Sequence, residues 1–292
     1  MDILSKKRSR LILLLAPALL IYLMFAIIPI FQSFWYSFFN WDGINQKIFI
    51  GVQNYLELFS DSDFYVALKN VFIILIGGLF VQIPVAYFFA SILSKKLKGT
   101  GFFKSVYFIP VIISTMIVAL MWSFILSPDY GLLNTFLKSA GLGKLALSWI
   151  GDKNLAIFSI AFVNVWQFVG MTMLLTLAGL QTIPEEINES CELDGAHGFI
   201  KTFKIDVPLI AEQLKTCIIL NTVGSLKTFD LVYALTNGGP GHSSDVLATY
   251  MYRQSITGMR YGYGMAVSVV IFLLALIISA TFLKITQRDE SK

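Results

Sequence analysis

An all-α membrane protein with six transmembrane helices is the fold class that the sequence predicts. Of its 292 residues, 56% are hydrophobic and only 14% are charged, whereas a soluble domain carries about 25% charged residues. The charges are clustered, so long apolar runs alternate with short polar segments. A hydrocarbon core of about 30 Å needs about 20 helical residues, and six of the runs reach that length.

The apolar runs predict the spans, which together form one transmembrane domain over residues 1–292. Pro84 and Pro110 fall inside two of them, which a membrane helix tolerates because its neighbours satisfy the freed backbone groups. The fifth run is the least apolar because it contains Lys227 and Asp230. The spans are expected at about residues 11–31, 71–93, 106–126, 155–180, 214–235 and 264–282.

The first apolar run is expected to stay in the protein. It follows a basic N-terminal segment, as the apolar core of a signal peptide also does. No charged residue occurs from Leu11 to Trp41, however, and such a run is too long for a signal core. We therefore expect an uncleaved first span.

Lysine and arginine residues predict the side of the membrane on which each loop lies. They are more frequent in cytoplasmic loops, and here they concentrate in both termini and in the loops after the second and fourth spans. Both termini are therefore expected in the cytoplasm. The residues are Lys6, Lys7, Arg8, Arg10, Lys95, Lys96, Lys98, Lys104, Lys201, Lys204, Lys215, Lys284, Arg288 and Lys292.

The same basic runs argue against a nucleic-acid partner, because the net charge is only +4 and the runs are explained by membrane topology. Cys191 and Cys217 have no disulfide or metal spacing and are read as inert thiols. His197 and His242 are single histidines in loops, so no metal site is expected.

The loop over residues 181–208 is expected in the cytoplasm, where basic residues are usually enriched, yet it is acidic overall. Pro184 suits the start of a helix, and Glu185 and Glu186 complement the dipole of its first turn. Gly195 is able to adopt positive φ at the end of that helix. A second short helix is expected at about 196–204. These residues alone leave open a plain amphipathic connector at the membrane surface.

The loop resembles the cytoplasmic coupling motif of ABC importer permeases, in which Glu-Ala-Ala precedes a glycine by fixed spacing and Ile-x-Leu-Pro follows it. Two alanines and a leucine of the motif are replaced here by small or aliphatic residues. The matching residues are Glu189, Ser190, Cys191, Gly195, Ile205, Asp206, Val207 and Pro208.

The resemblance implies a type I ABC importer permease in the cytoplasmic membrane of a bacterium, without enzymatic activity of its own. Its partners would be a second permease subunit, two cytoplasmic ATPases that carry ATP and Mg, and an extracellular solute-binding protein. No phosphate-binding loop of the G-x-x-x-x-G-K-[ST] type occurs in the chain. The implied ATPase-coupling residues are Glu189, Ser190, Cys191, Asp194, Gly195 and Ala196.

A second resemblance concerns the segments 235–241 and 247–252, which look like the external segment of carbohydrate permeases of the maltose and glycerol-phosphate type. It implies a sugar or oligosaccharide as the solute. A non-sugar solute such as a glycerol-phosphate is the alternative within the family.

Polar faces on the fourth and fifth expected spans predict the substrate path, because polar groups inside spans usually face a cavity or a partner. Packing between helices is the alternative role for such residues. Lys227 and Asp230, three apart, are expected to pair on one helix face as a structural or gate-lining pair. The path residues are Asn164, Gln167, Phe168, Met171, Asn221, Gly224, Ser225 and Thr228.

Two other classes of membrane protein are weighed against this interpretation. An ion-driven secondary transporter would carry charged relay residues in several spans, and only the fifth expected span has them. An intramembrane enzyme would need a catalytic group such as paired acids, and the spans contain none.

Overall fold

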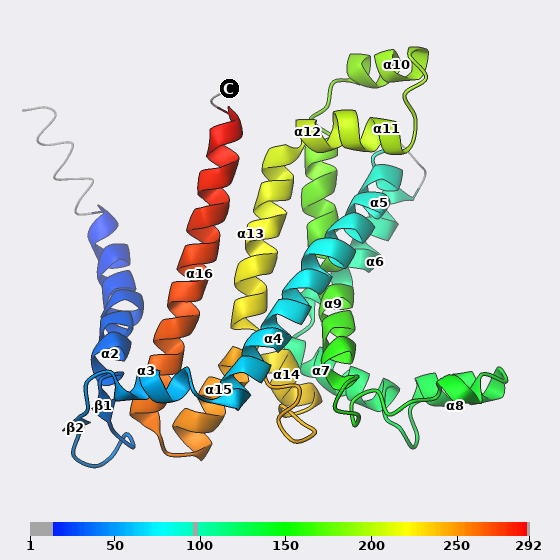
Figure 1. Ribbon diagram of the computed structural model, residues 1–292. Coiled ribbons are helices and arrows are strands. Elements are labelled where there is room, and N and C mark those ends of the chain that lie inside the picture. The colour runs from blue at the N-terminus through cyan, green and yellow to red at the C-terminus, as the bar shows by residue number, and fades with distance from the viewer. Residues whose placement is uncertain (1–13, 96–98, 291–292) are drawn as a thin grey trace, which may run out of the picture. The chain divides into compact units, whose positions relative to one another are not determined.

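The computed structural model describes residues 14–95 and 99–290, and these are predominantly helical (Figure 1). They form two compact units. The first combines the residues up to Asp61 with Met251–Leu273, and the second combines Ser62–Tyr250 with the residues from Leu274 onward. The single domain over residues 1–292 stays a prediction.

The first unit begins with a helix over Leu14–Tyr36, which contains the π-helical segment η1 (Leu23–Ile27) and α2 (Ile28–Tyr36). Residues 11–13 of the predicted first span and the basic N-terminus lie outside the described residues. Two short strands, β1 (Phe39–Asn40) and β2 (Ile48–Phe49), then pair antiparallel. The helix α3 (Gln53–Leu58) follows.

The connection between the two strands is closed by Asp42. Its carboxylate accepts hydrogen bonds from the backbone N–H groups of Ile44 at 2.9 Å and Asn45 at 2.8 Å. These bonds, Ile44 first, lower the pKa of the Asp42 carboxyl. In the same unit, Arg260 donates to Glu57 at 2.6 Å and ties the entry of α16 (Tyr261–Glu290) to α3.

The second unit begins with one continuous helix over Ser62–Leu93, made of α4 (Ser62–Gly77), the π-helical η2 (Gly78–Gln82) and α5 (Ile83–Leu93). The predicted second span, 71–93, is the later part of this helix. Its start at Ser62 is earlier than hydropathy indicates because a polar first turn that includes Asp63 continues into the apolar run.

The third predicted span, 106–126, is not one straight helix. The structure has α6 (Thr100–Ile112) and α7 (Thr115–Ile125), which are bent by 96° relative to each other. Ile113 and Ser114 between them are extended, with ψ of 137° and 132°. The helix therefore breaks after Pro110, and its composition stays apolar across the break.

The remaining elements of the second unit alternate long and short helices. The helix α8 (Leu132–Ser139) is followed by the 3-10 turn η3 (Gly143–Leu145). The fourth span is α9 (Ala156–Leu180). Next come α10 (Glu185–Leu193), α11 (Phe199–Lys201), η4 (Thr202–Asp206), α12 (Val207–Leu209), α13 (Ala211–Lys227), α14 (Asp230–Leu235) and α15 (Leu247–Tyr252). The last two residues of α15 and the π-helical η5 (Arg253–Thr257) belong to the first unit.

Four helices of the described residues are long and apolar enough to cross a membrane, and the bent α6–α7 pair is a fifth if it forms one span. The predicted fifth span, 214–235, is interrupted, since α13 ends at Lys227 and α14 begins at Asp230. Within the second unit, α10 and α11 lie beyond one end of α5, α9 and α13, whereas α8 and α14 lie at the other end (Figure 1).

The core of the second unit forms where α5 and α9 pack closely. Ala86 and Ala90 of α5 are fully buried against Met173 and Leu177 of α9, and Ile210 closes the cluster. Small residues permit this approach of two backbones, which drives helix association in membranes.

Candidate functional site

The loop between the fourth and fifth predicted spans is built around α10. Pro184 precedes the helix with ψ of 145°, and α10 begins at Glu185 with Glu186 beside it in the first turn. Two carboxylates near the positive end of a helix stabilise it by about 0.3–1 kcal/mol each at exposed sites. Residues within the segment itself therefore favour the start of α10 at Glu185.

Gly195 ends α10 in the left-handed conformation, as the sequence predicts, with φ of 68°. The N–H of Gly195 donates to the carbonyl of Glu192 at 3.2 Å, and that of Ala196 donates to the carbonyl of Cys191 at 2.8 Å. This pair of bonds is the Schellman arrangement, which favours glycine at the turning residue. The chain consequently reverses at Gly195.

The predicted coupling residues do not all face the same way. Glu189, Ser190, Asp194 and Gly195 are exposed, Ala196 is half-buried, and Cys191 is buried with 5% of its surface exposed. Cys191 thus anchors the inner face of α10, and the exposed residues form its outer face.

The second helix of the loop differs from the prediction of 196–204. It starts at Phe199, because Gly198 before it has φ of 57° and ψ of −126°, which is outside the helical region. Helical turns then continue through η4 and α12 to Leu209. The expected stop near residue 204 is therefore wrong, and Pro208 lies in the first turn of α12, where proline is tolerated.

Large apolar side chains project from this loop. Leu193 is 89% exposed, Phe199 82% and Phe203 64%, and the rings of the two phenylalanines stack with centroids 6.2 Å apart. Exposed apolar groups gathered in this way, with an acidic helix beside them, mark a surface that contacts another protein or a membrane.

A cavity of about 300 Å³ lies among α9, α13 and α14. Seven of the eight predicted path residues line it. Its wall also includes residues that the sequence analysis did not predict, among them Gln82, Thr115 and Phe229. Gln82 could have been predicted, because a glutamine inside an apolar run usually faces a cavity or a partner. The predicted residues at the wall are Asn164, Phe168, Met171, Asn221, Gly224, Ser225 and Thr228.

Gln167 is the predicted path residue that does not line this cavity. It is 1% exposed, and its Nε2 lies 3.4 Å from the carbonyl oxygen of Ile113 and 3.2 Å from Thr115 Oγ1. Its amide thus binds the α6–α7 break, where helical hydrogen bonds are missing. Helical spacing predicted that Gln167 shares a face with Asn164 and Phe168. Its amide instead contacts the break between α6 and α7.

Lys227 and Asp230 line the cavity, but they do not share one helix face. Lys227 ends α13 and Asp230 begins α14, with Thr228 extended between them at ψ of 114°. The predicted pairing on one helix is therefore wrong. Both charged groups stand at a break whose backbone faces a cavity, as broken membrane helices require.

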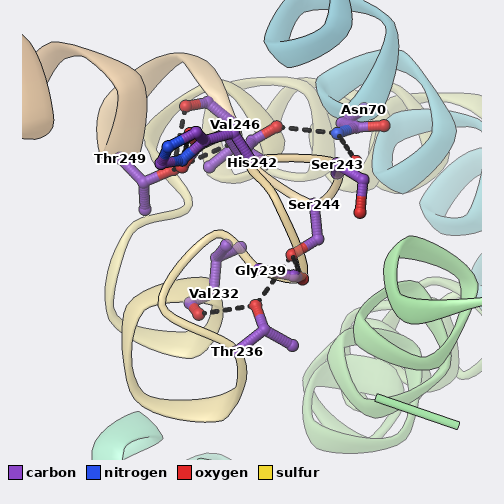
Figure 2. A network of polar contacts seen from close by, with 10 residues as sticks. Asn70, Val232, Thr236, Gly239, His242, Ser243, Ser244, Val246 and Thr249 are labelled. Carbon is purple, nitrogen blue, oxygen red and sulfur yellow. Dashed lines mark hydrogen bonds and ion pairs between the residues drawn. The ribbon is translucent and has the colours of Figure 1, made fainter. Parts of the chain in front are cut away.

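The segment over residues 236–246 is held by a network of polar contacts (Figure 2). Asn70 of α4 donates to the carbonyl oxygens of Ser243 and Asp245, both at 2.8 Å. The Asp245 carboxylate accepts from Thr249 at 2.8 Å and lies 3.3 Å from His242 Nδ1. Thr236 and Ser244 are linked at 2.8 Å.

Replacing Asn70 with alanine is expected to destabilise the protein by about 1–3 kcal/mol, because two carbonyl groups then lose their donor. Thermal unfolding of the detergent-solubilised protein measures the change. The matched control is Asn154→Ala, since Asn154 is exposed and its loss should leave the midpoint unchanged. Equal midpoints for the two variants would contradict the structural role of Asn70.

In the part of the chain that the structure describes, no group of three His, Cys, Asp or Glu residues is placed to hold an ion. Both cysteines are free and buried.

Several long apolar helices, with a cavity whose wall includes polar side chains such as Asn164 and Asn221, are typical of a multi-pass membrane protein. A family model described as the inner membrane component of binding-protein-dependent transport systems matches residues 82–288. The chain belongs to this family, and the resemblance inferred from the coupling motif is confirmed.

Relatives along nearly the whole chain agree with this membership. The probable ABC transporter permease YurN of Bacillus subtilis is 38% identical, covering 93% of this chain and 94% of its own. The trehalose/maltose permease MalF of Thermococcus litoralis is 32% identical over 94% and 92%. The sn-glycerol-3-phosphate permease UgpA of Escherichia coli is 31% identical over 91% and 90%.

A solved structure shows the same fold. A chain of a bacterial ABC transporter involved in the import of the acidic polysaccharide alginate matches with a TM-score of 0.84 and 23% identity, covering 98% of this chain and 99% of that chain. The ABC importer permease fold is therefore shared.

Proposed function

We propose that the protein is one permease subunit of an ATP-driven importer and forms half of the path for a sugar or oligosaccharide. A second permease subunit would supply the other half, and an external binding protein would deliver the solute. The observation that carries this proposal is the exposed acidic helix α10, turned sharply at Gly195, in a chain that belongs to the permease family.

Energy for transport would come from two cytoplasmic ATPase subunits, which bind ATP and Mg in place of this non-catalytic chain. Glu189, Ser190 and Asp194 on the outer face of α10 would contact them. A carboxylate contact across an interface contributes mostly to specificity and to the rate of association. Different contacts in the two nucleotide states would then bias the permease between outward-open and inward-open forms.

A sugar fits the cavity better than a purely apolar solute. The wall presents the amides of Asn164 and Asn221 for hydroxyl groups and the rings of Phe168 and Phe229 for the apolar face of a pyranose. Sugar-transport relatives support this assignment. Lipid surrounds the spans, and both termini would lie in the cytoplasm of a bacterial cell.

A glycerol-phosphate is the second candidate, favoured by the relative UgpA and by Lys227 at the cavity wall. Asp230 beside it opposes an anion. Competition of radiolabelled maltose and glycerol-3-phosphate uptake in cells distinguishes the two. An ion-driven secondary transporter would take up solute with inactive ATPases, and the proposal expects no uptake in that case.

The central experiment replaces Glu189 with alanine or Gly195 with valine in the assembled transporter. Association with the ATPases is expected to weaken about tenfold or more, corresponding to ~1.4 kcal/mol, and uptake is expected to fall with it. Co-purification of the subunits measures the association. The matched control is Glu212→Ala, an exposed glutamate outside the loop. Wild-type association and uptake in the Glu189 and Gly195 variants would refute the proposal.

A further inference from the structure

A buried carboxylate joins the coupling loop to a membrane helix. Asp206, at the end of η4, is 5% exposed, and its Oδ2 accepts a hydrogen bond from the Tyr87 hydroxyl of α5 at 2.7 Å. Thr202 Oγ1 lies 3.2 Å from the same tyrosine oxygen, and Lys201 Nζ lies 3.4 Å from Asp206 Oδ1. Two segments 119 residues apart in the chain therefore meet through one phenol.

Two residues of the π-helical segment η4 reach Tyr87. Thr202 and Asp206 are the first and last residues of this segment. A π-helix has a wider turn than an α-helix and occurs mostly as a single turn at functional sites. Residues four apart lie close together on one side of a helix, so both side chains meet the same hydroxyl.

The environment of Asp206 makes this contact energetically important. A buried charge is costly unless it is paired and hydrogen-bonded. The Oδ1 atom of Asp206 has the ion pair with Lys201 but no hydrogen bond among the described residues. The Tyr87 hydroxyl is thus the strong donor to this carboxylate, and its loss leaves the charge poorly solvated.

Tyr87 also connects to the cavity. Its ring packs against the core in which α5, α9 and Ile210 meet. On the same continuous helix, Gln82 lines the cavity and donates to Thr172 Oγ1 at 2.6 Å. A displacement of η4 carried by Tyr87 would therefore reach the cavity wall along one continuous helix.

We propose that Tyr87 and Asp206 are positioning residues that make the second segment of the coupling loop and α5 move as one body. They contact no solute and act by transmitting movement of the loop to the cavity. This inference rests on the proposed function, because it assumes that ATPases displace the loop. It predicts loss of coupling with retention of ATPase binding.

The test uses the full transporter in lipid vesicles with its ATPases and a reporter thiol in the cavity wall. The variant Gly224→Cys provides a thiol at the cavity wall, because a Cβ at Gly224 meets no atom within 4 Å. Labelling of the protein without this change, whose two cysteines are buried, is subtracted as background. The rate of labelling by N-ethylmaleimide is measured with and without Mg-ATP. With Tyr87 present, ATP is expected to change this rate.

In the Tyr87→Phe variant, the change that ATP causes in the labelling rate is expected to shrink about fivefold or more, the size of a typical coupling between sites. ATPase association and basal hydrolysis should persist. Asp206→Asn keeps an acceptor and is expected to rescue part of the response, whereas Asp206→Ala should match Tyr87→Phe. The double variant should be no worse than either single change.

The matched control is Tyr107→Phe, since Tyr107 packs against the same core. An unchanged response in Tyr87→Phe would overturn the inference. A parallel loss of ATPase binding, hydrolysis and thermal stability would overturn it too, because the contact would then be only structural. If ATP leaves the labelling rate unchanged even with Tyr87 present, the proposed function itself fails.

Discussion

Replacing Gly170 with valine is expected to prevent accumulation of the folded protein. A Cβ at Gly170 of α9 would lie 1.9 Å from the backbone carbonyl oxygen of Tyr107 in α6. A backbone atom cannot rotate away as a side chain does, so the two helices must separate. Overpacking of a tight core costs about 3 kcal/mol, a large share of the roughly 5–15 kcal/mol that holds a domain together.

The yield of monodisperse protein in detergent, measured by gel filtration, reports this effect. Gly101→Val is the matched control, because Gly101 lies in α6 and no atom is within 4 Å of its Cβ position. Normal yield and stability of the Gly170 variant would show that α6 and α9 do not approach as closely as described.

Replacing Asn164 with leucine is expected to reduce solute uptake by about tenfold or more. Asn164 is half-buried at the cavity wall, and leucine removes its amide at similar volume. A site built to hydrogen-bond a hydroxyl loses about 1–3 kcal/mol when the partner group is left unpaired. The ATPases should still bind, because the residues proposed to contact them lie on α10, at the other end of the second unit from α14 (Figure 1).

Uptake of a panel of radiolabelled sugars, with subunit co-purification in parallel, measures this effect. The variant Asn154→Leu makes the same substitution at an exposed position of the second unit and should transport normally. If Asn164→Leu transports at the wild-type rate, the cavity is a packing feature and not the solute path.

Much of the fold was predictable because an apolar run of consecutive residues is enough to indicate a membrane-spanning helix. The second, fourth and sixth apolar runs, and the described part of the first from Leu14 onward, each lie in a helix long enough to cross a membrane. The turn at Gly195 was also predictable from the sequence, since the positive φ that commonly ends a helix favours glycine. In both cases the information lies within one helix or one turn.

The breaks within helices were less predictable. The 96° bend after α6 lies in a segment that remains apolar throughout, and the amide of Gln167 from another helix stabilises it. The interruption at Thr228 is likewise not visible in the sequence pattern, because it depends on the cavity that Thr228 lines in the folded protein. Such breaks depend on partners far away in the chain, and periodicity does not report them.

By itself, the sequence determined that this chain spans a membrane several times and belongs to the permease family. It also determined that an acidic loop contains a helix that ends in a turn at Gly195. Only the tertiary structure decided that Gln167 binds a helix break while Asn164 faces the cavity, and that Tyr87 meets Asp206. The physical reason is that hydropathy and turn preference are properties of neighbouring residues. The partner of a polar side chain inside a helix bundle is chosen by how distant helices pack.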